Sequence, residues 1–236
     1  EDGGMSDSVD SVPNRATEMI SLDLIDRDQV RNIPVPMMIN DDDARVLRNL
    51  AEGTRLIIEI GSFTGASAKE FAEGMGQDGR LVCIDHFNPL ASVVAKPLPR
   101  PLLVGFLLTR LRDHLDRVSI MVATSMEASR LFKLGIADLV FIDAAHDYAN
   151  VAADIAAWLP VVKPTGLMVG HDWDKAGVEM KPEELRAFAE RENGPGGIHC
   201  GVIAAVQDAF KEVLIPDGEN SLWIARPEWA RRKEGA

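Results

Sequence analysis

The sequence predicts an α/β fold in which a mostly parallel, doubly wound sheet ends in an antiparallel hairpin. Three features of the sequence lead to this prediction. Short apolar runs alternate with helical segments, as they do in parallel sheets. The runs are apolar along their whole length, which is typical of strands that have helices on both faces. Two short strand-like segments near the end of the chain flank a turn-forming stretch, which is typical of a hairpin.

Seven segments are predicted as strands. The parallel ones are residues 55–60, 81–85, 118–123, 138–143 and 166–170. The hairpin consists of residues 212–216 and 221–226, which flank the turn at 217–220. We therefore expect a sheet of seven strands whose last two are antiparallel and close one edge.

Helices are predicted before and between these strands. Asn40 precedes three aspartates, so it can cap a helix whose first turn complements the helix dipole, and Gly53 can end that helix. Pro101 stands where another helix can begin. The remaining periodic segments are residues 66–75, 102–111, 126–134, 151–159, 182–192 and 202–212. Helices of this number can cover both faces of the sheet.

Composition and charge exclude several classes of protein. The chain has 236 residues, 46% hydrophobic and 26% charged, as expected of a globular domain. Its formal charge of −12 would repel a phosphate backbone, so we expect no nucleic-acid partner. The apolar stretch 102–108 is far shorter than the roughly 20 residues that span a bilayer, so we expect no membrane partner. The N-terminal residues lack the pattern of a secretory signal, and Cys83 and Cys200 form no CxxC pair, so we expect a cytoplasmic protein.

The first predicted strand leads into a turn of small residues. Gly61 and Gly65 follow Glu59 there and would let the backbone approach a ligand. Their spacing matches neither the G-x-G-x-x-G of dinucleotide sites nor a P-loop, and a tight turn without a ligand is the alternative. Asp85 ends the second strand, where an acidic side chain can accept hydrogen bonds from ribose hydroxyls. Ser125 follows the third strand, where it could border a base or cap a helix.

Three segments resemble motifs of class I S-adenosylmethionine-dependent methyltransferases. They are EIGSFTGAS at residues 59–67, CIDHF at 83–87 and FIDAAHDY at 141–148. Residues 141–173, followed by GVIAAVQDAF, are similar to a branch of small O-methyltransferases that includes tailoring enzymes for sugars and natural products. The resemblance covers roughly residues 40–227. It implies a Rossmann-like sheet of seven strands with a terminal hairpin, in agreement with the pattern of strands described above.

The resemblance also implies S-adenosylmethionine as the cofactor and assigns residues to it. Glu59 would help to hold the methionine ammonium group, and Asp85 would bind the ribose. Gly61 and Gly65 would bring backbone to the cofactor. Further candidates for cofactor contact are Ser62, Ser125 and Asp143. In relatives a cover folds over cofactor and substrate at the position of Met37, Met38 and Ile39, although ordinary core packing explains these residues equally well.

Polar side chains follow the fourth and fifth predicted strands. Asp143 ends the fourth strand, and His171 and Asp172 end the fifth. His146 lies in the loop after Asp143. Because ligands collect beyond the carboxyl ends of strands in an open α/β sheet, we expect these four side chains to converge. Loop capping by the two aspartates is the structural alternative.

Two mechanisms at these strand ends could remove the proton of a hydroxyl that receives a methyl group. His146 could act as general base beside Asp143, which makes these two the candidate catalytic residues. Alternatively, Asp143, His171 and Asp172 could hold a divalent metal, magnesium or manganese, that lowers the pKa of the hydroxyl. Related metal-dependent O-methyltransferases have two adjacent oxygen-bearing residues after the fifth strand. His171 departs from that pattern, which leaves iron, zinc or no metal open as well.

The sequence therefore predicts an S-adenosylmethionine-dependent O-methyltransferase that acts on a small hydroxylated acceptor, with metal assistance left open. A nicotinamide-dependent oxidoreductase and a non-catalytic methyltransferase-like binding module are the alternatives. We expect a disordered tail at 1–16, a helical cap at 17–54, the methyltransferase domain at 55–227 and a basic tail at 228–236. The apolar face of residues 102–111 fits either the core or a contact in a homodimer.

Overall fold

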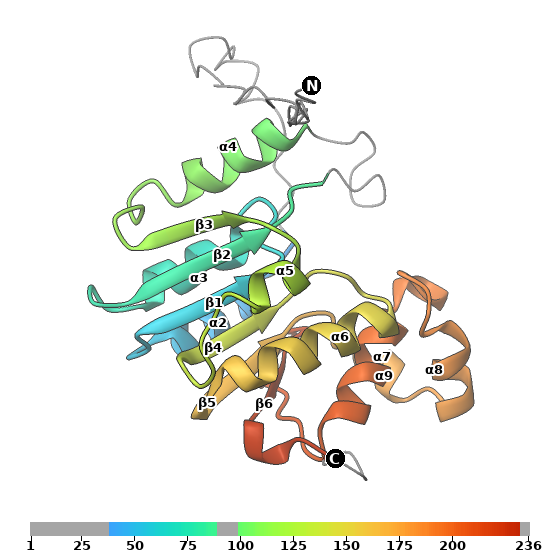
Figure 1. The fold of residues 1–236 in the computed structure, drawn as a ribbon. Helices are drawn as coiled ribbons and strands as arrows, with labels where there is room; N and C mark the ends of the chain where they lie inside the picture. Colours follow the sequence, from blue (N-terminus) through green and yellow to red (C-terminus); the bar gives the residue numbers. More distant parts are fainter. Residues whose placement is uncertain (1–37, 89–98, 232–236) are drawn as a thin grey trace, which may run out of the picture. The chain divides into compact units, whose positions relative to one another are not determined.

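The computed structural model describes residues 38–88 and 99–231, which contain one mixed sheet (Figure 1). Its strands are β1 (Leu56–Ile60), β2 (Arg80–Asp85), β3 (Val118–Val122), β4 (Ala137–Ile142), β5 (Val162–Gly170) and β6 (Trp223–Ala225). They are ordered β3-β2-β1-β4-β5-β6. The first five are parallel, and β6 pairs antiparallel with β5. The predicted fold class is confirmed, and all five predicted parallel strands are present.

The sheet has six strands in the described ranges, so the prediction of seven is wrong. The segment 212–216 contributes only an isolated bridge between Leu214 and Ile224. Leu214 N donates to Ile224 O at 2.8 Å, and Ile224 N donates to Leu214 O at 2.9 Å. The next hydrogen-bonded pair of an antiparallel ladder would need an N–H at Pro216, which has none. The hairpin therefore stops at one bridge, and only its second half continues as β6.

Helices lie on both sides of the sheet (Figure 1). Those that pack on one face are α2 (Asp41–Ala51), α3 (Ala66–Gly74) and α4 (Arg100–Arg110). Those that pack on the other are α5 (Ser125–Ser129), α6 (Tyr148–Trp158), α8 (Pro182–Phe188) and α9 (Cys200–Ala209). A short α7 (Lys175–Val178) and three single turns of 3₁₀-helix at Leu159–Val161, Pro195–Gly197 and Pro227–Trp229 complete the described elements. None of the helices in these ranges is long and apolar enough to cross a membrane.

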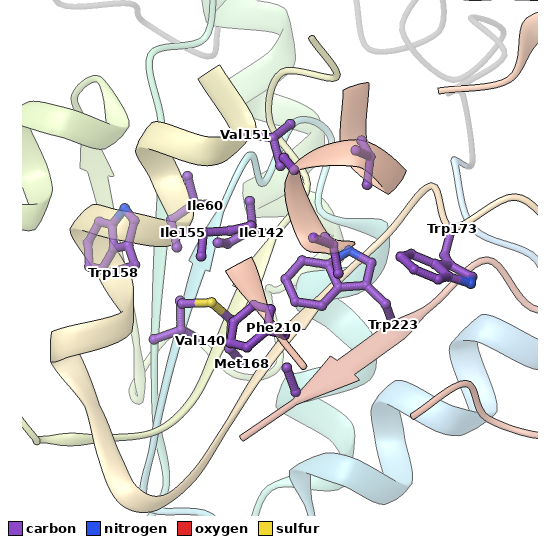
Figure 2. Close-up of a cluster of buried hydrophobic side chains, with 14 of the residues drawn as sticks. Ile60, Val140, Ile142, Val151, Ile155, Trp158, Met168, Trp173, Phe210 and Trp223 are labelled. Carbon is purple, nitrogen blue, oxygen red and sulfur yellow. The ribbon is translucent and has the colours of Figure 1, made fainter. Parts of the chain in front are cut away.

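The core has two halves because the strands alternate between the faces of the sheet. Val140 and Ile142 of β4 face the half that contains α6, where Figure 2 shows Ile142 near Ile155. Leu139 and Phe141 of the same strand face α2, α3 and α4 instead. The edge strand β3 is an exception to the expected burial on both faces, since it is only partly buried along its length. The buried central strands hold the loops at their carboxyl ends in fixed positions.

The predicted helix start at Asn40 is confirmed, and it ties distant segments together. The Asn40 side chain accepts a hydrogen bond from Asp43 N at 2.8 Å, and the Asp43 carboxylate accepts one from Asn40 N at 3.1 Å. The two residues thus form a capping box at the start of α2. Asp43 also accepts a hydrogen bond from Ser221 N at 3.0 Å. The first turn of α2 is thereby fixed against the segment that leads into β6.

The predicted helix at 126–134 is much shorter than expected. It ends at Ser129, and Leu131 and Leu134 beyond it are 72% and 73% exposed, so no apolar burial extends it. Its N-cap is Thr124, which forms a capping box with Glu127. The predicted helix at 182–192 likewise ends early, at Phe188. In the first case apolar periodicity overestimates the helix because the apolar residues that continue the pattern are exposed.

The buried carboxyl group of Asp154 gives the first prediction, which concerns stability. Asp154 in α6 is 5% exposed and accepts a hydrogen bond from the Ser125 hydroxyl. Burial raises the pKa of Asp154 to about 6. Between about pH 4 and pH 6 the unfolded chain releases this proton while the folded chain keeps it, so the contribution of Asp154 to stability falls as pH rises. Asp154→Asn, which stays neutral, should remove this dependence.

We expect the free energy of unfolding of wild-type to fall by about 2–3 kcal/mol relative to that of Asp154→Asn between pH 4 and pH 7. Urea unfolding of both proteins at four pH values in this range measures the difference. Parallel stability profiles would show that the pKa of Asp154 is not raised in the folded chain.

Candidate active site

The strand order reverses between β1 and β4, and the candidate site lies at the carboxyl ends of these two strands. The chain runs from β1 outward to β2 and β3 on one side, and from β4 to β5 and β6 on the other. Crevices at such switch points are the usual ligand sites of open α/β sheets. Gly61 N donates to Ile84 O, and Asp143 N donates to Ile60 O, each at 2.9 Å. These bonds fix the loop after β1 against β2 and against the loop after β4.

Gly61 and Gly65 lie where the structure has no room for a side chain. Gly61 has a φ of +91°, and a Cβ there would lie 1.9 Å from the backbone oxygen of Asp143. Gly65 has a φ of +83°, and a Cβ there would lie 2.5 Å from the side chain of Leu107 in α4. The turn after β1 therefore has to approach both neighbours with bare backbone.

Two buried oxygen atoms near this turn have no hydrogen-bond partner within the described part of the chain. They are Glu59 Oε2 and Ser62 Oγ. The other oxygen of the fully buried Glu59, Oε1, accepts a hydrogen bond from Ser67 Oγ at 2.5 Å. Burial raises the pKa of Glu59 to about 7. Because orphaned buried acceptors are rare, this pair fits a ligand that carries hydrogen-bond donors, such as an ammonium group.

A small pocket opens beside these atoms, with Ser62, Ser67 and Asp143 in its wall. Met38 and Ile39 also line it. Ile39 is buried, whereas Met38 is 48% exposed. The predicted cover residues in the described ranges therefore border the pocket, while Met37 lies outside these ranges.

Asp85 joins two loops at the end of β2. Its Oδ2 accepts a hydrogen bond from Phe63 N at 2.7 Å, and its Oδ1 accepts one from Phe87 N at 2.6 Å. Both phenylalanines have positive φ, 43° and 47°. A carboxylate offers about four acceptor positions, so Asp85 keeps capacity for further donors such as ribose hydroxyls.

The hydroxyl group of Ser125 contacts helix α6. The hydroxyl donates a hydrogen bond to Asp154 and accepts one from Trp158 Nε1 at 2.9 Å. Both partners belong to α6. The hydroxyl of Ser125 thus supports the packing of α6, and its contact with a cofactor stays a prediction.

Four side chains at the ends of β4 and β5 form a histidine–aspartate cluster, which comprises Asp143, His146, His171 and Asp172. His146 Nε2 lies 2.9 Å from Asp172 Oδ2 and 3.9 Å from Asp143 Oδ1. His171 Nδ1 lies 3.1 Å from Asp172 Oδ1. Ligand atoms of Asp143, His171 and Asp172 all lie within 4.8 Å of one another. The structure therefore brings together the four residues that the sequence analysis expected to converge.

Three further residues surround the cluster, and the sequence analysis missed their role. Glu192 Oε1 lies 2.6 Å from His146 Nδ1, and His199 Nδ1 lies 3.2 Å from Asp172 Oδ1. Asp43 Oδ2 lies 3.3 Å from His171 Nε2. Glu192 and His199 belong to loop segments without a recognisable motif, so no signal marked them. Asp43 was identified only as part of a helix start, and its proximity to His171 depends on tertiary packing.

The charges in the cluster compensate one another. Burial disfavours the charged form of His146, but the nearby carboxylates of Asp143 and Asp172 outweigh burial and raise the pKa of His146 to about 11. Burial is outweighed in the same way at His171, where Asp172 and Asp43 raise the pKa to about 11. Hydrogen bonds from the histidines hold the pKa of Asp172 far below its usual range, against the opposing effect of burial. As the side chains lie, the surrounding carboxylates favour the protonated form of both imidazoles.

A doubly wound sheet with a glycine turn after β1, an acid at the end of β2 and polar residues after β4 and β5 agrees with the class I methyltransferase fold that the sequence motifs resemble. Residues 58–173 match the sequence profile of a family described as a methyltransferase domain. Together with the fold, this match identifies residues 58–173 as a methyltransferase domain. No curated protein sequence matches the chain.

Solved structures with the same fold include methyltransferases with bound cofactor. The cofactor-bound structure of Rv0187 from MTB is similar with a TM-score of 0.61 and 19% identity, over 84% of each chain. The O-methyltransferase TomG from Streptomyces achromogenes, involved in tomaymycin synthesis and bound to SAM, has a TM-score of 0.58 and 18% identity, over 84% of this chain and 86% of TomG. An O-methyltransferase from Bacillus cereus in complex with SAH has a TM-score of 0.56 and 18% identity, over 83% and 84%. At these identities the likeness is one of fold.

Proposed function

We propose that the protein transfers the methyl group of S-adenosylmethionine to a hydroxyl oxygen of a small acceptor, with a divalent cation assisting. The observation that carries the proposal is the position of the histidine–aspartate cluster, in which Asp143 belongs both to the cluster and to the wall of the pocket beside Gly61. S-adenosylmethionine supplies a methyl group on a positively charged sulfur. The protein then has to align the acceptor oxygen and remove its proton.

The residues around the glycine turn fit the cofactor. Glu59 Oε2 and Ser62 Oγ offer unpartnered buried acceptors to the methionine ammonium group. Asp85 offers its remaining acceptor positions to the ribose. Gly61 and Gly65 leave the backbone of the turn uncovered by side chains. The SAM and SAH in the solved structures of TomG and of the Bacillus cereus enzyme support S-adenosylmethionine as the cofactor.

The proton of the acceptor hydroxyl passes to His146 in this proposal. Glu192 fixes the ring from its Nδ1 side, so that Nε2 points to Asp172 and Asp143. The ring can take up a proton only after it has lost the one that these carboxylates stabilise. A divalent cation, magnesium or manganese, would be held by Asp143, His171 and Asp172 and would lower the pKa of a bound hydroxyl. Its positive charge would also reduce the effect by which the two aspartates raise the pKa of His146.

A methyl-transfer assay tests the function directly. The protein is incubated with S-adenosylmethionine carrying a labelled methyl group and with phenols, catechols and hydroxylated sugars, with magnesium, manganese or a chelator. We expect a labelled methyl ether, identified by mass spectrometry, and less product with the chelator. Cofactor binding without transfer to any acceptor would favour a non-catalytic module. Binding of NADH without binding of S-adenosylmethionine would favour an oxidoreductase.

A further inference from the structure

We propose a second metal site, in which His146, Asp172 and His199 bind a zinc-like transition-metal ion and binding inhibits methyl transfer. The site differs from the cation site of the proposed function by two of its three residues. Only the inhibition depends on the proposed function, whereas the binding of the ion depends on the geometry of the three side chains.

The distances among the three side chains suit a single ion. His146 Nε2 lies 2.9 Å from Asp172 Oδ2, and His199 Nδ1 lies 3.2 Å from Asp172 Oδ1. All three ligand atoms lie within 4.8 Å of one another, and the centroids of the two imidazole rings are 4.3 Å apart. Neighbouring donors around a tetrahedral zinc ion are separated by roughly 3.3 Å, given zinc–nitrogen bonds of about 2.0–2.1 Å. Small side-chain movements would therefore complete the site.

An outer carboxylate already orients one of the ligands. Glu192 Oε1 lies 2.6 Å from His146 Nδ1, the ring nitrogen that faces away from Asp172. Glu192 Oε2 also accepts a hydrogen bond from the backbone N of His146 at 3.4 Å. Histidines that bind metals usually have a carboxylate or carbonyl at the second ring nitrogen, which fixes the ring and increases its basicity. His146 has this arrangement without any contribution from the ion.

The site is accessible and carries negative charge. The side chains of His146, Asp172 and His199 are 18%, 15% and 23% exposed, and that of Glu192 is 39% exposed. An ion can thus enter from solvent past Glu192 and His199. Asp172 in the inner site and Glu192 outside it together compensate a divalent charge.

The donor set selects the class of metal. Two imidazoles and one carboxylate suit zinc, cobalt, nickel or iron(II), whereas magnesium prefers oxygen donors alone. Asp143, His171 and Asp172 provide two carboxylates and one imidazole, which is closer to the preference of manganese or magnesium. The two sets share Asp172, so an ion bound to one set competes with an ion bound to the other.

Inhibition follows from the use of His146. A ring whose Nε2 binds a metal ion cannot accept the proton of the acceptor hydroxyl. The same ion also removes Asp172 from the set that assists the reaction. Zinc at this site is therefore expected to block methyl transfer even when S-adenosylmethionine is bound.

The binding test uses calorimetry with zinc and the visible absorption of cobalt(II) in the full chain. We expect wild-type to bind one ion, His199→Ala and Glu192→Gln to bind it at least about 10-fold more weakly, and magnesium not to displace cobalt at equal concentration. His86→Ala, which removes a histidine outside the cluster, should bind the ion as wild-type does. Circular dichroism of each variant checks that it is folded. Absence of binding by wild-type, or equal binding by wild-type, His199→Ala and Glu192→Gln, would overturn the proposal.

The inhibition test uses the methyl-transfer assay with manganese. We expect zinc to inhibit wild-type, and His199→Ala to need at least about 10-fold more zinc for the same fractional inhibition, measured for each protein against its own activity without zinc. Equal inhibition of both proteins would overturn the inhibitory role of the site. If the chain transferred no methyl group at all, the proposed function would fail, and the cobalt spectra would still decide whether the metal site exists.

Discussion

His146→Ala is expected to lower kcat/KM for methyl transfer by about 100- to 10,000-fold, the usual contribution of a positioned general base. The affinity for S-adenosylhomocysteine should stay close to that of wild-type. The reason is that, among the residues the structure describes, the ion pairs and the ring contact of the His146 side chain are with Asp143, Asp172, Glu192 and His199, and not with the glycine turn. Steady-state kinetics with the best acceptor and calorimetry with S-adenosylhomocysteine measure the two quantities separately.

Tyr148→Phe is the matched control for this substitution. Tyr148 follows His146 closely in the chain, and its hydroxyl donates a hydrogen bond to Asp208 Oδ2 at 2.9 Å, away from the cluster. We expect this variant to keep the kcat/KM of wild-type. If His146→Ala lost cofactor affinity to the same extent as it lost kcat/KM, His146 would be a cofactor-binding residue and the assignment as base would be wrong.

Gly61→Ala is expected to destabilise the fold by about 2–5 kcal/mol, the sum of the costs of a left-handed backbone and of overpacking. A Cβ at this position would lie 1.9 Å from the backbone oxygen of Asp143, so the loop after β4 would have to move. That movement would also displace the histidine–aspartate cluster. We expect the variant to unfold at a lower urea concentration and to lose methyl transfer.

Gly53→Ala separates the cost of the left-handed backbone from the cost of overpacking. Gly53 also has a positive φ, +73°, but a Cβ there would have no atom within 4 Å. The free energy of unfolding of this variant should therefore fall by only about 1–2 kcal/mol, the cost of the left-handed backbone. If both variants lost the same free energy of unfolding, the close approach of Gly61 to Asp143 would not contribute to the cost of Gly61→Ala.

The sequence predicted the parallel part of the sheet well because buried parallel strands are continuous apolar runs. The hairpin was predicted less accurately, since Pro216 limits a pairing that apolar pattern alone suggests. The helix after β3 was overestimated for a related reason, because Leu131 and Leu134 continue the apolar pattern without being buried. Patterns of residues indicate which segments can be buried, and only tertiary packing decides which are.

The candidate site was predicted in part for a similar reason. Asp143 and Asp172 converge because strand ends meet at one edge of a parallel sheet, a rule that needs no knowledge of loops. Glu192 and His199 reach the cluster from a loop whose path depends on Gly and Pro backbone geometry, and the pattern of residues does not encode that path. His171 was expected among the metal ligands, but its second partner, Asp43, lies far away in the sequence and could be found only from the fold.

Calorimetric titration of the folded chain with S-adenosylhomocysteine tests the central claim most directly. We expect wild-type to bind one equivalent, and Asp85→Ala to bind about 10- to 100-fold more weakly, as the loss of hydrogen bonds to a charged group predicts. The affinity of Asp85→Asn, which keeps an acceptor oxygen for the loop amides, should lie between the affinities of wild-type and Asp85→Ala. Absence of heat from folded wild-type with both S-adenosylhomocysteine and S-adenosylmethionine would contradict the account.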